Sequence, residues 1–286
     1  MQADAALRTA PAGAEETGGP TAAGGNRRTA AGGRFALKVV TYNIHRCIDR
    51  AGVADPEQIA AVIAPTGADV VALQEVDADR PRTGRIHQGR RLAERLGMRV
   101  CYFPVIRPRG GCYGLAVLSR FEYEEVQFGR LPAPRLRRPR EARGAMWLRL
   151  ATSHGPIHLV NTHLGLQARE RRMQIEALLG DQWLGALGDD APLVLCGDFN
   201  AGLRSYVYRR VVDRLADVHR LRPVETGRRA TFFSFYPLWC LDHIFVSSHL
   251  TPLRVAVPSA PPAPRASDHL PVFAALAFAA APEEGP

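Results

Sequence analysis

The sequence predicts an α/β protein with one large folded domain. Short runs rich in β-branched residues alternate along the chain with stretches whose apolar residues recur at helical spacing. The chain has 286 residues, of which 46% are hydrophobic, so it can bury a full core as a single domain. No internal repeat and no coiled-coil heptad is present in the sequence.

Local signals place each element in chain order. The first strand is expected at 35–43, and a helix at 55–64 starts with a capping residue followed by proline, Asp55 and Pro56. The longest helix is expected at 168–187. The other expected elements are a helix at 88–96 and strands at 69–74, 100–105, 113–118, 146–151, 157–161, 193–196, 241–246 and 272–278.

The two ends of the chain differ in composition from the rest. Residues 1–33 are mostly Ala, Gly, Thr, Pro and charged residues without an apolar period, which predicts a disordered N-terminal tail. The folded domain is then expected at 34–280, followed by a flexible C-terminus at 281–286. Because no apolar stretch matches a secretory signal or a membrane span, we expect no transmembrane segment and a cytoplasmic protein.

The cysteines and the charges exclude some classes and leave others open. Five cysteines lie scattered in mostly apolar runs, which favours reduced core residues over a disulfide set. The formal net charge is +9, and its clustered part is a run of arginines with one acid, Glu141, among them. This arginine cluster could attract phosphate-bearing substrates or could be a solvated loop; it comprises Arg130, Arg135, Arg137, Arg138, Arg140 and Arg143.

Polar residues that could carry chemistry stand where buried strands end. The apolar run 193–196 leads into Gly197, Asp198, Phe199 and Asn200. One such segment could be only a turn with an Asx cap. Similar signals recur at wide spacing, at Asn43, at Glu75 after Gln74, at His163 after Asn161 and Thr162, at Asp242–His243 and at Ser267–Asp268–His269.

This ordered set resembles the endonuclease/exonuclease/phosphatase superfamily of metal-dependent phosphohydrolases, over roughly residues 35–279. The resemblance implies a DNase I-like fold: a four-layer α/β/β/α sandwich of two packed mixed β-sheets flanked by helices. It places the site at one end of the sheets. Among the branches of the superfamily, the chain is most similar to uncharacterised bacterial hydrolases, for which the fold does not imply a substrate.

Cleavage of a phosphate ester needs a divalent cation, a base for water and a group that stabilises the departing oxygen. Mg²⁺, or Mn²⁺, takes few oxygen ligands from the protein, and the resemblance implies Glu75, Asn43 and Asp268. It also implies that Asp198 orients or deprotonates the attacking water. His269 would pair with a carboxylate such as Asp268 and stabilise the pentacoordinate phosphorus or transfer a proton.

Further roles follow from the same resemblance. Asn200 would contact phosphoryl oxygens or a second metal, His163 would face the phosphate, and Asp242 would orient His163 or Asp198. Substrate contacts are expected from Arg143 and from the Tyr113 hydroxyl, for which core packing is the alternative.

His45 stands where several family branches have an acid, which removes one carboxylate from the metal shell. The remaining histidines, at 87, 154, 158, 219 and 249, are expected on the surface or in packing roles.

The predicted function is a metal-dependent phosphoesterase, more specifically a phosphodiesterase, that uses in-line attack of water on a phospholipid head group or a small phosphorylated compound. One alternative is a DNA or RNA nuclease guided by the arginine cluster. A second alternative is an inactive phosphate-binding module. The sequence argues against it, because loss of activity would be expected to remove at least one of Glu75, Asp198, Asp268 and His269, and all four are present. Nucleic acid and a peripheral anionic membrane are candidate partners, and we expect a monomer.

Overall fold

Two six-stranded mixed β-sheets pack face to face in the computed structural model, which describes residues 36–134, 141–188 and 191–279. The predicted tail, the C-terminus and four members of the arginine cluster, Arg135, Arg137, Arg138 and Arg140, lie outside these residues. The first sheet has the order β11-β12-β1-β2-β4-β3, with β1 (Leu37–Asn43), β2 (Val70–Ala78), β3 (Arg99–Ile106), β4 (Cys112–Ser119), β11 (Leu250–Ala256) and β12 (Val272–Phe278).

The second sheet has the order β5-β6-β7-β8-β10-β9. Its strands are β5 (Tyr123–Arg130), β6 (Gly144–Thr152), β7 (Gly155–His163), β8 (Leu193–Asp198), β9 (Ala216–Asp217) and β10 (Asp242–Val246). In each sheet one central pair is parallel, β1 with β2 and β7 with β8, and the other pairings are antiparallel.

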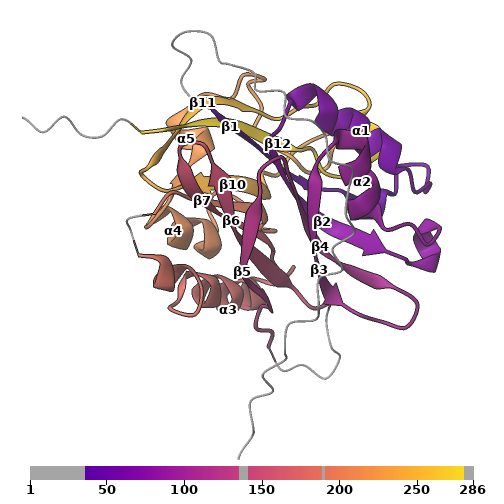
Figure 1. The fold of residues 1–286 in the computed structure, drawn as a ribbon, viewed down its shortest axis with the longest axis horizontal. Helices are drawn as coiled ribbons and strands as arrows, with labels where there is room; N and C mark the ends of the chain where they lie inside the picture. The colour runs from indigo at the N-terminus through magenta and orange to yellow at the C-terminus, as the bar shows by residue number, and fades with distance from the viewer. Residues whose placement is uncertain (1–35, 135–140, 189–190, 280–286) are drawn as a thin grey trace, which may run out of the picture. The chain divides into compact units, whose positions relative to one another are not determined.

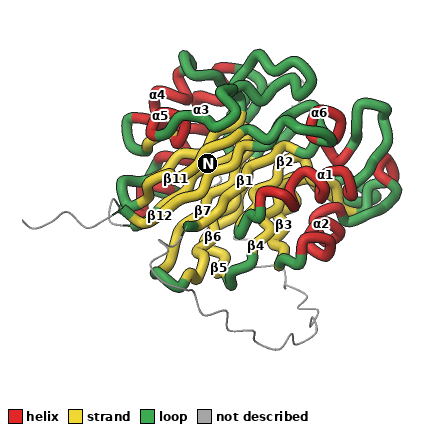
Figure 2. Tube along the Cα trace, turned by 90° about the horizontal axis from the view of Figure 1, so that it is seen from above, coloured by secondary structure: helices red, strands yellow, loops and turns green. Residues whose placement is uncertain are grey.

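Helices cover the outer face of each sheet, as Figures 1 and 2 show. α1 (Pro56–Ile63) and α2 (Gln88–Leu96) lie on the side of the first sheet, and α3 (Ala168–Leu179) and α4 (Tyr206–Val212) lie on the side of the second. Two short helices, α5 (Val218–Leu221) and α6 (Ala263–Ala266), complete the set in the described chain. The predicted four-layer sandwich is therefore confirmed.

Alternating side chains of the central strands explain their continuous apolar runs. In β8, Val194 and Cys196 belong to the core between the sheets, whereas Leu195 belongs to the core under α3 and α4. A strand with helices on one face and a second sheet on the other needs apolar residues at every position. No helix among the described residues has both the length and the apolar character needed to cross a membrane.

Most predicted elements are found within a few residues of their expected bounds, and two predictions need correction. The long helix expected at 168–187 ends at Leu179, because Gly180 has extended backbone angles, and a separate 3-10 helix follows at Leu184–Leu187. Strand β2 does not end before Glu75; it continues to Ala78 through a register shift between Leu73 and Val76. The strands β5, β9 and β11 were not predicted.

Candidate active site

Strand ends from both sheets meet at one edge of the sandwich and bring the predicted polar residues together. Asn43 ends β1, His163 ends β7 and Asp198 ends β8. Strand β10 runs antiparallel to β8, so that its first residue, Asp242, lies directly opposite Asp198. The site is thus built from strand termini, which the surrounding hydrogen-bonded sheets hold rigidly.

Asp198 is at the centre of this arrangement. Asn43 Nδ2 donates a hydrogen bond to Asp198 Oδ2 over 2.9 Å, and the backbone N–H of Asn200 donates to Oδ1 over 2.8 Å. The Nε2 atoms of His163 and His269 lie 3.4 and 3.7 Å from Oδ2. Burial raises the pKa of Asp198 to about 6, against the opposing effect of the positive charge on His269.

His269 forms a dyad with Asp242, whose Oδ2 accepts from Nδ1 over 2.8 Å. The sequence suggested Asp268 as its carboxylate partner, but the adjacent Asp268 points elsewhere and pairs with His45. Burial lowers the pKa of His269, yet the negative charges of Asp242 and Asp198 outweigh burial and raise it to about 10. At neutral pH the imidazolium therefore faces the Asp198 carboxylate.

His163 has the opposite electrostatic environment. Its Nδ1 lies 3.2 Å from Arg143 Nη1, which also donates to Glu141 Oε1 over 2.7 Å. Burial and the positive charges of Arg143 and His269 hold the pKa of His163 well below its usual range. Since an arginine only donates, Nδ1 accepts from it, and the neutral tautomer has its proton on Nε2, toward Asp198. Asp242, predicted to orient His163 or Asp198, lies opposite Asp198 and is hydrogen-bonded to His269, and the side chain that contacts His163 Nδ1 is Arg143.

Glu75 extends from a bulge in β2, where its φ is +58°. The positive φ departs from the alternation of the strand and redirects the side chain. Asn43 Nδ2 donates to Glu75 Oε1 over 3.3 Å, while Oε2 has no hydrogen bond from the described residues and only an ion pair at 3.8 Å with Arg46. Because Glu75 Oε2 accepts no hydrogen bond there, it can coordinate a cation.

Asp268 lies at the same rim through its neighbour Ser267, whose hydroxyl donates to the Asn43 carbonyl oxygen over 2.7 Å. Its own Oδ1 lies 2.9 Å from His45 Nδ1. Burial acts to raise the pKa of Asp268, but the hydrogen bond from His45 and the charge of His269 lower it overall. His45 thus does not replace the missing acid; it holds the remaining one as a carboxylate.

The predicted ligands Glu75, Asn43 and Asp268 offer oxygen atoms of the kind that Mg²⁺ or Mn²⁺ prefers, although Asn43 Oδ1 already accepts a hydrogen bond from the His45 backbone N–H over 3.0 Å. Among the described residues, one group of three His, Cys, Asp or Glu side chains has all its ligand atoms within 4.8 Å, and it is Asp198, Asp242 and His269. In this group His269 is hydrogen-bonded to one carboxylate and faces the other, so its ring nitrogens are already engaged.

The two predicted substrate residues are largely buried. Tyr113 donates its hydroxyl to Glu141 Oε1 over 3.1 Å, so Glu141 joins Tyr113 to Arg143. Burial is the main cause that raises the pKa of Tyr113.

Asn200 has a φ of +48°. Its side-chain Nδ2 donates to the Leu164 carbonyl oxygen over 3.0 Å and lies 3.2 Å from His163 Nε2.

Several supporting residues had no predicted role, although Gln74 and Asn161 were part of the sequence motifs. Gln74 and Asn161 join the two sheets beneath the site, with Gln74 Nε2 donating to Asn161 Oδ1 over 2.7 Å. Arg46, beside Glu75, has a φ of +58°, which no pattern in the sequence signals. Glu141 did carry a signal, because it is the lone acid in the arginine cluster.

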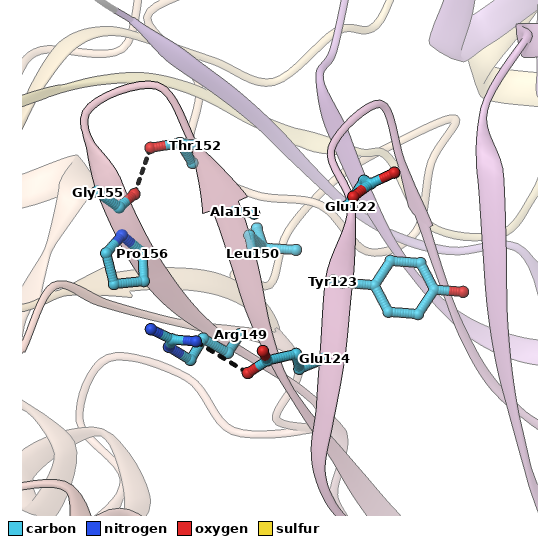
Figure 3. Close-up of a pocket in the computed structure, with 9 residues that line it drawn as sticks. All are labelled: Glu122, Tyr123, Glu124, Arg149, Leu150, Ala151, Thr152, Gly155 and Pro156. Atoms are coloured by element: carbon cyan, nitrogen blue, oxygen red, sulfur yellow. Dashed lines mark hydrogen bonds and ion pairs between the residues drawn. The ribbon is translucent and has the colours of Figure 1, made fainter.

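A concavity of about 310 Å³, shown in Figure 3, lies away from this site. Its lining includes Glu124 and Arg149, which form an ion pair at 2.9 Å, and the start of β7, at Gly155 and Pro156. Since His163 is at the other end of β7, this groove is remote from Asp198.

Comparison with known proteins agrees with the geometry. Residues 40–269 match the family described as Endonuclease/Exonuclease/phosphatase family. The chain is 27% identical over 241 residues to the uncharacterized protein YbhP of Escherichia coli K12, covering 79% of this chain and 90% of that protein.

Solved structures show the same fold. An endonuclease/exonuclease/phosphatase from Beutenbergia cavernae DSM 12333 is 26% identical with a TM-score of 0.70, over 87% of this chain and 73% of that one. A mannosyl-6-phosphatase of Bacteroides thetaiotaomicron VPI-5482 is 21% identical with a TM-score of 0.64, over 85% of this chain and 100% of that one. The match to the family model spans most of the folded chain, from β1 to His269, and the chain therefore belongs to the endonuclease/exonuclease/phosphatase family.

Proposed function

We propose that the protein is a divalent-metal-dependent phosphoesterase, more specifically a phosphodiesterase, that works by in-line attack of water. One observation carries the proposal: a buried carboxylate, Asp198, faces a charged His269 whose far nitrogen is held by Asp242. Such a pair supplies a base and a cation at one point, which is what hydrolysis of a phosphate ester requires.

In the proposed mechanism Asp198 takes a proton from the attacking water as the water oxygen bonds to phosphorus, while the P–O bond to the alcohol breaks on the opposite side and the departing oxygen takes a proton from solvent. A pKa of about 6 leaves this carboxylate ionised at neutral pH and still basic enough to accept the proton. The His269 cation stabilises negative charge on the phosphoryl oxygens, and Asp242 holds the ring in place. His163 is neutral and is held by Arg143, and its Nε2–H points toward the Asp198 carboxylate. Mg²⁺ or Mn²⁺, held by Glu75, Asn43 and Asp268, would neutralise charge on the phosphate.

The site supports a phosphate ester without selecting the alcohol. Of the arginine cluster proposed to guide a nucleic acid, the structure describes Arg130 and Arg143, and both are engaged within the protein. Arg130 donates to the Val105 carbonyl oxygen over 2.7 Å, and Arg143 contacts Glu141 and His163. A nuclease is therefore an outcome of the substrate screen below. A monomeric state and a cytoplasmic location belong to the same proposal, and size-exclusion chromatography of the full chain tests the former.

The test is hydrolysis of bis-p-nitrophenyl phosphate with Mg²⁺ or Mn²⁺, with p-nitrophenyl phosphate as the monoester. The wild type should turn over the diester only with metal, and Asp198→Ala and His269→Ala should each lose on the order of 10²-fold or more in kcat. His154→Ala is the matched control, because this exposed histidine lies in the turn at the opposite end of β7. Full turnover in either site variant, or none in the folded wild type with either metal, would contradict the proposal. Turnover would justify a screen of lipids, nucleic acids and inositol phosphates.

A further inference from the structure

An exposed apolar segment is anchored directly to the candidate active site. The Phe232 ring lies 4.8 Å from the His269 ring, centroid to centroid, and the two residues form an isolated β-bridge. The Ser234 backbone N–H donates to the Asp268 carbonyl oxygen over 2.8 Å. The segment that follows Phe232 is thus held at the rim of the site by backbone contacts.

Six large apolar side chains are exposed here, and we call them the aromatic rim: Leu203, Phe233, Phe235, Tyr236, Leu238 and Trp239. They are half of the twelve exposed large hydrophobic residues in the described chain. Tyr236, Leu238 and Trp239 are 67%, 58% and 49% exposed. An apolar concentration of this kind beside a site marks an interaction surface rather than random exposure.

The charge around the aromatic rim is positive. Residues 201–212 and 226–241, which contain the whole rim, have five arginines and no aspartate or glutamate, and one of the five, Arg210, is paired with Glu176 and Asp213. Arg204 and Arg229 line a shallow groove of about 470 Å³ together with Leu203, Leu238 and Trp239. Within the described residues, neither of these two guanidinium groups forms a hydrogen bond or an ion pair through its side chain. The surface is therefore complementary to a partner that combines negative charge, which the arginines would contact, with an apolar interior, which the exposed apolar side chains would contact.

The packing of the rings favours a hydrocarbon partner over stacked nucleobases. The Phe232 and Phe233 rings lie 3.9 Å apart, and the Arg50 guanidinium covers the Phe235 ring at 4.2 Å. Base stacking needs free ring faces, and these contacts occupy one face of the Phe233 ring and one face of the Phe235 ring. Ring edges, leucines and an indole at the surface instead suit the boundary between lipid head groups and acyl chains, where arginines meet lipid phosphates.

We propose that the aromatic rim docks the protein on an anionic phospholipid bilayer, with the active site next to the lipid surface. The docking is inferred from the aromatic rim and the arginines beside it. Its consequence, that the phosphate ester cleaved belongs to a molecule at the bilayer surface, rests on the proposed function.

Tryptophan fluorescence gives a direct test. Of the three tryptophans, Trp147 and Trp183 are buried and Trp239 is exposed, so a change of emission reports the rim. In EDTA and low salt, the full chain should sediment with vesicles of phosphatidylcholine and phosphatidylglycerol, with a blue shift, and bind pure phosphatidylcholine several-fold less. Trp239→Phe should still sediment without the shift.

The double variant Tyr236→Ser, Leu238→Ser should bind the anionic vesicles about tenfold more weakly or worse, since both apolar side chains are lost. Leu221→Ser, which removes an exposed leucine from α5, should bind like the wild type. Equal loss in both, or no sedimentation of the wild type, would overturn the docking. Binding to a single-stranded oligonucleotide in place of vesicles, with quenching of Trp239, would overturn it in favour of nucleic acid.

The outcomes separate docking from catalysis. Metal-dependent turnover of the soluble diester without vesicle binding would reject the docking and keep the proposed function. Vesicle binding without turnover would do the reverse.

Discussion

Replacing Asn161 by alanine should destabilise the protein by about 3–4 kcal/mol, because this side chain joins the two sheets. Its Nδ2 donates to the carbonyl oxygens of Leu73 and Ala116, each over 3.0 Å, and its Oδ1 accepts from Gln74. Asn161 and Gln74 are fully buried, so no water replaces what is lost. Three hydrogen bonds at about 1 kcal/mol each account for most of the loss, and imperfect closure of the small cavity adds to it.

Urea unfolding followed by circular dichroism measures the effect, with the slope m expected to stay unchanged. Gln182→Ala, which removes an exposed amide, should stay within about 0.5 kcal/mol of the wild type. Asn161→Asp keeps the acceptor for Gln74 but sets a carboxylate against two carbonyl oxygens, so it should cost at least as much as alanine. A loss below about 1 kcal/mol in Asn161→Ala would refute the idea that this contact holds the sheets together.

Two further predictions concern histidines in opposite environments. Asp242→Asn removes a charge that raises the pKa of His269, so the imidazolium should deprotonate at lower pH. The alkaline limb of the pH profile of kcat should move toward neutrality, and kcat should fall on the order of 10²-fold. An unmoved limb would show that Asp242 does not control the pKa of His269. His219 is fully buried, neither ring nitrogen has a hydrogen bond in the described chain, and burial lowers its pKa to about 4. Its folded pKa lies below its unfolded value of about 6.5, so its stability contribution is complete above that pH and is lost as the pH falls toward 4, by up to about 3 kcal/mol. His219→Leu should flatten this slope in urea unfolding, whereas the exposed His154→Leu should keep it; equal slopes in wild type and His219→Leu would contradict the assignment.

The sequence predicted the central strands well because they are buried on both faces and read as unbroken apolar runs. The edge strand β5 was missed, since it is half exposed and mixes glutamates with apolar residues. The length of the long helix was overestimated because apolar spacing continues past Gly180, where the backbone changes direction. Short β9 offers no pattern at all.

The candidate site shows the same division. Most of the predicted residues were named from apparent strand ends and from the family resemblance, but their partners could not be named. His269 follows Asp268 in the chain and yet contacts Asp242, 27 residues away. Asp268 contacts His45, and His163 contacts Arg143. The individual roles assigned to these residues stay predictions until the variants are measured.

The sequence by itself determined which chemical groups are available and that most of them stand near strand ends. Buried strands require runs of apolar residues, so a polar residue that follows such a run marks the place where the strand ends. Only the tertiary structure decided which groups face each other. Antiparallel pairing of β8 with β10 inside the second sheet sets the register of Asp198 against Asp242, and the bulge in β2 redirects Glu75. These are contacts over long sequence separations, so their geometry, and the pKa values of Asp198 and His269 that follow from it, exist only in the folded protein.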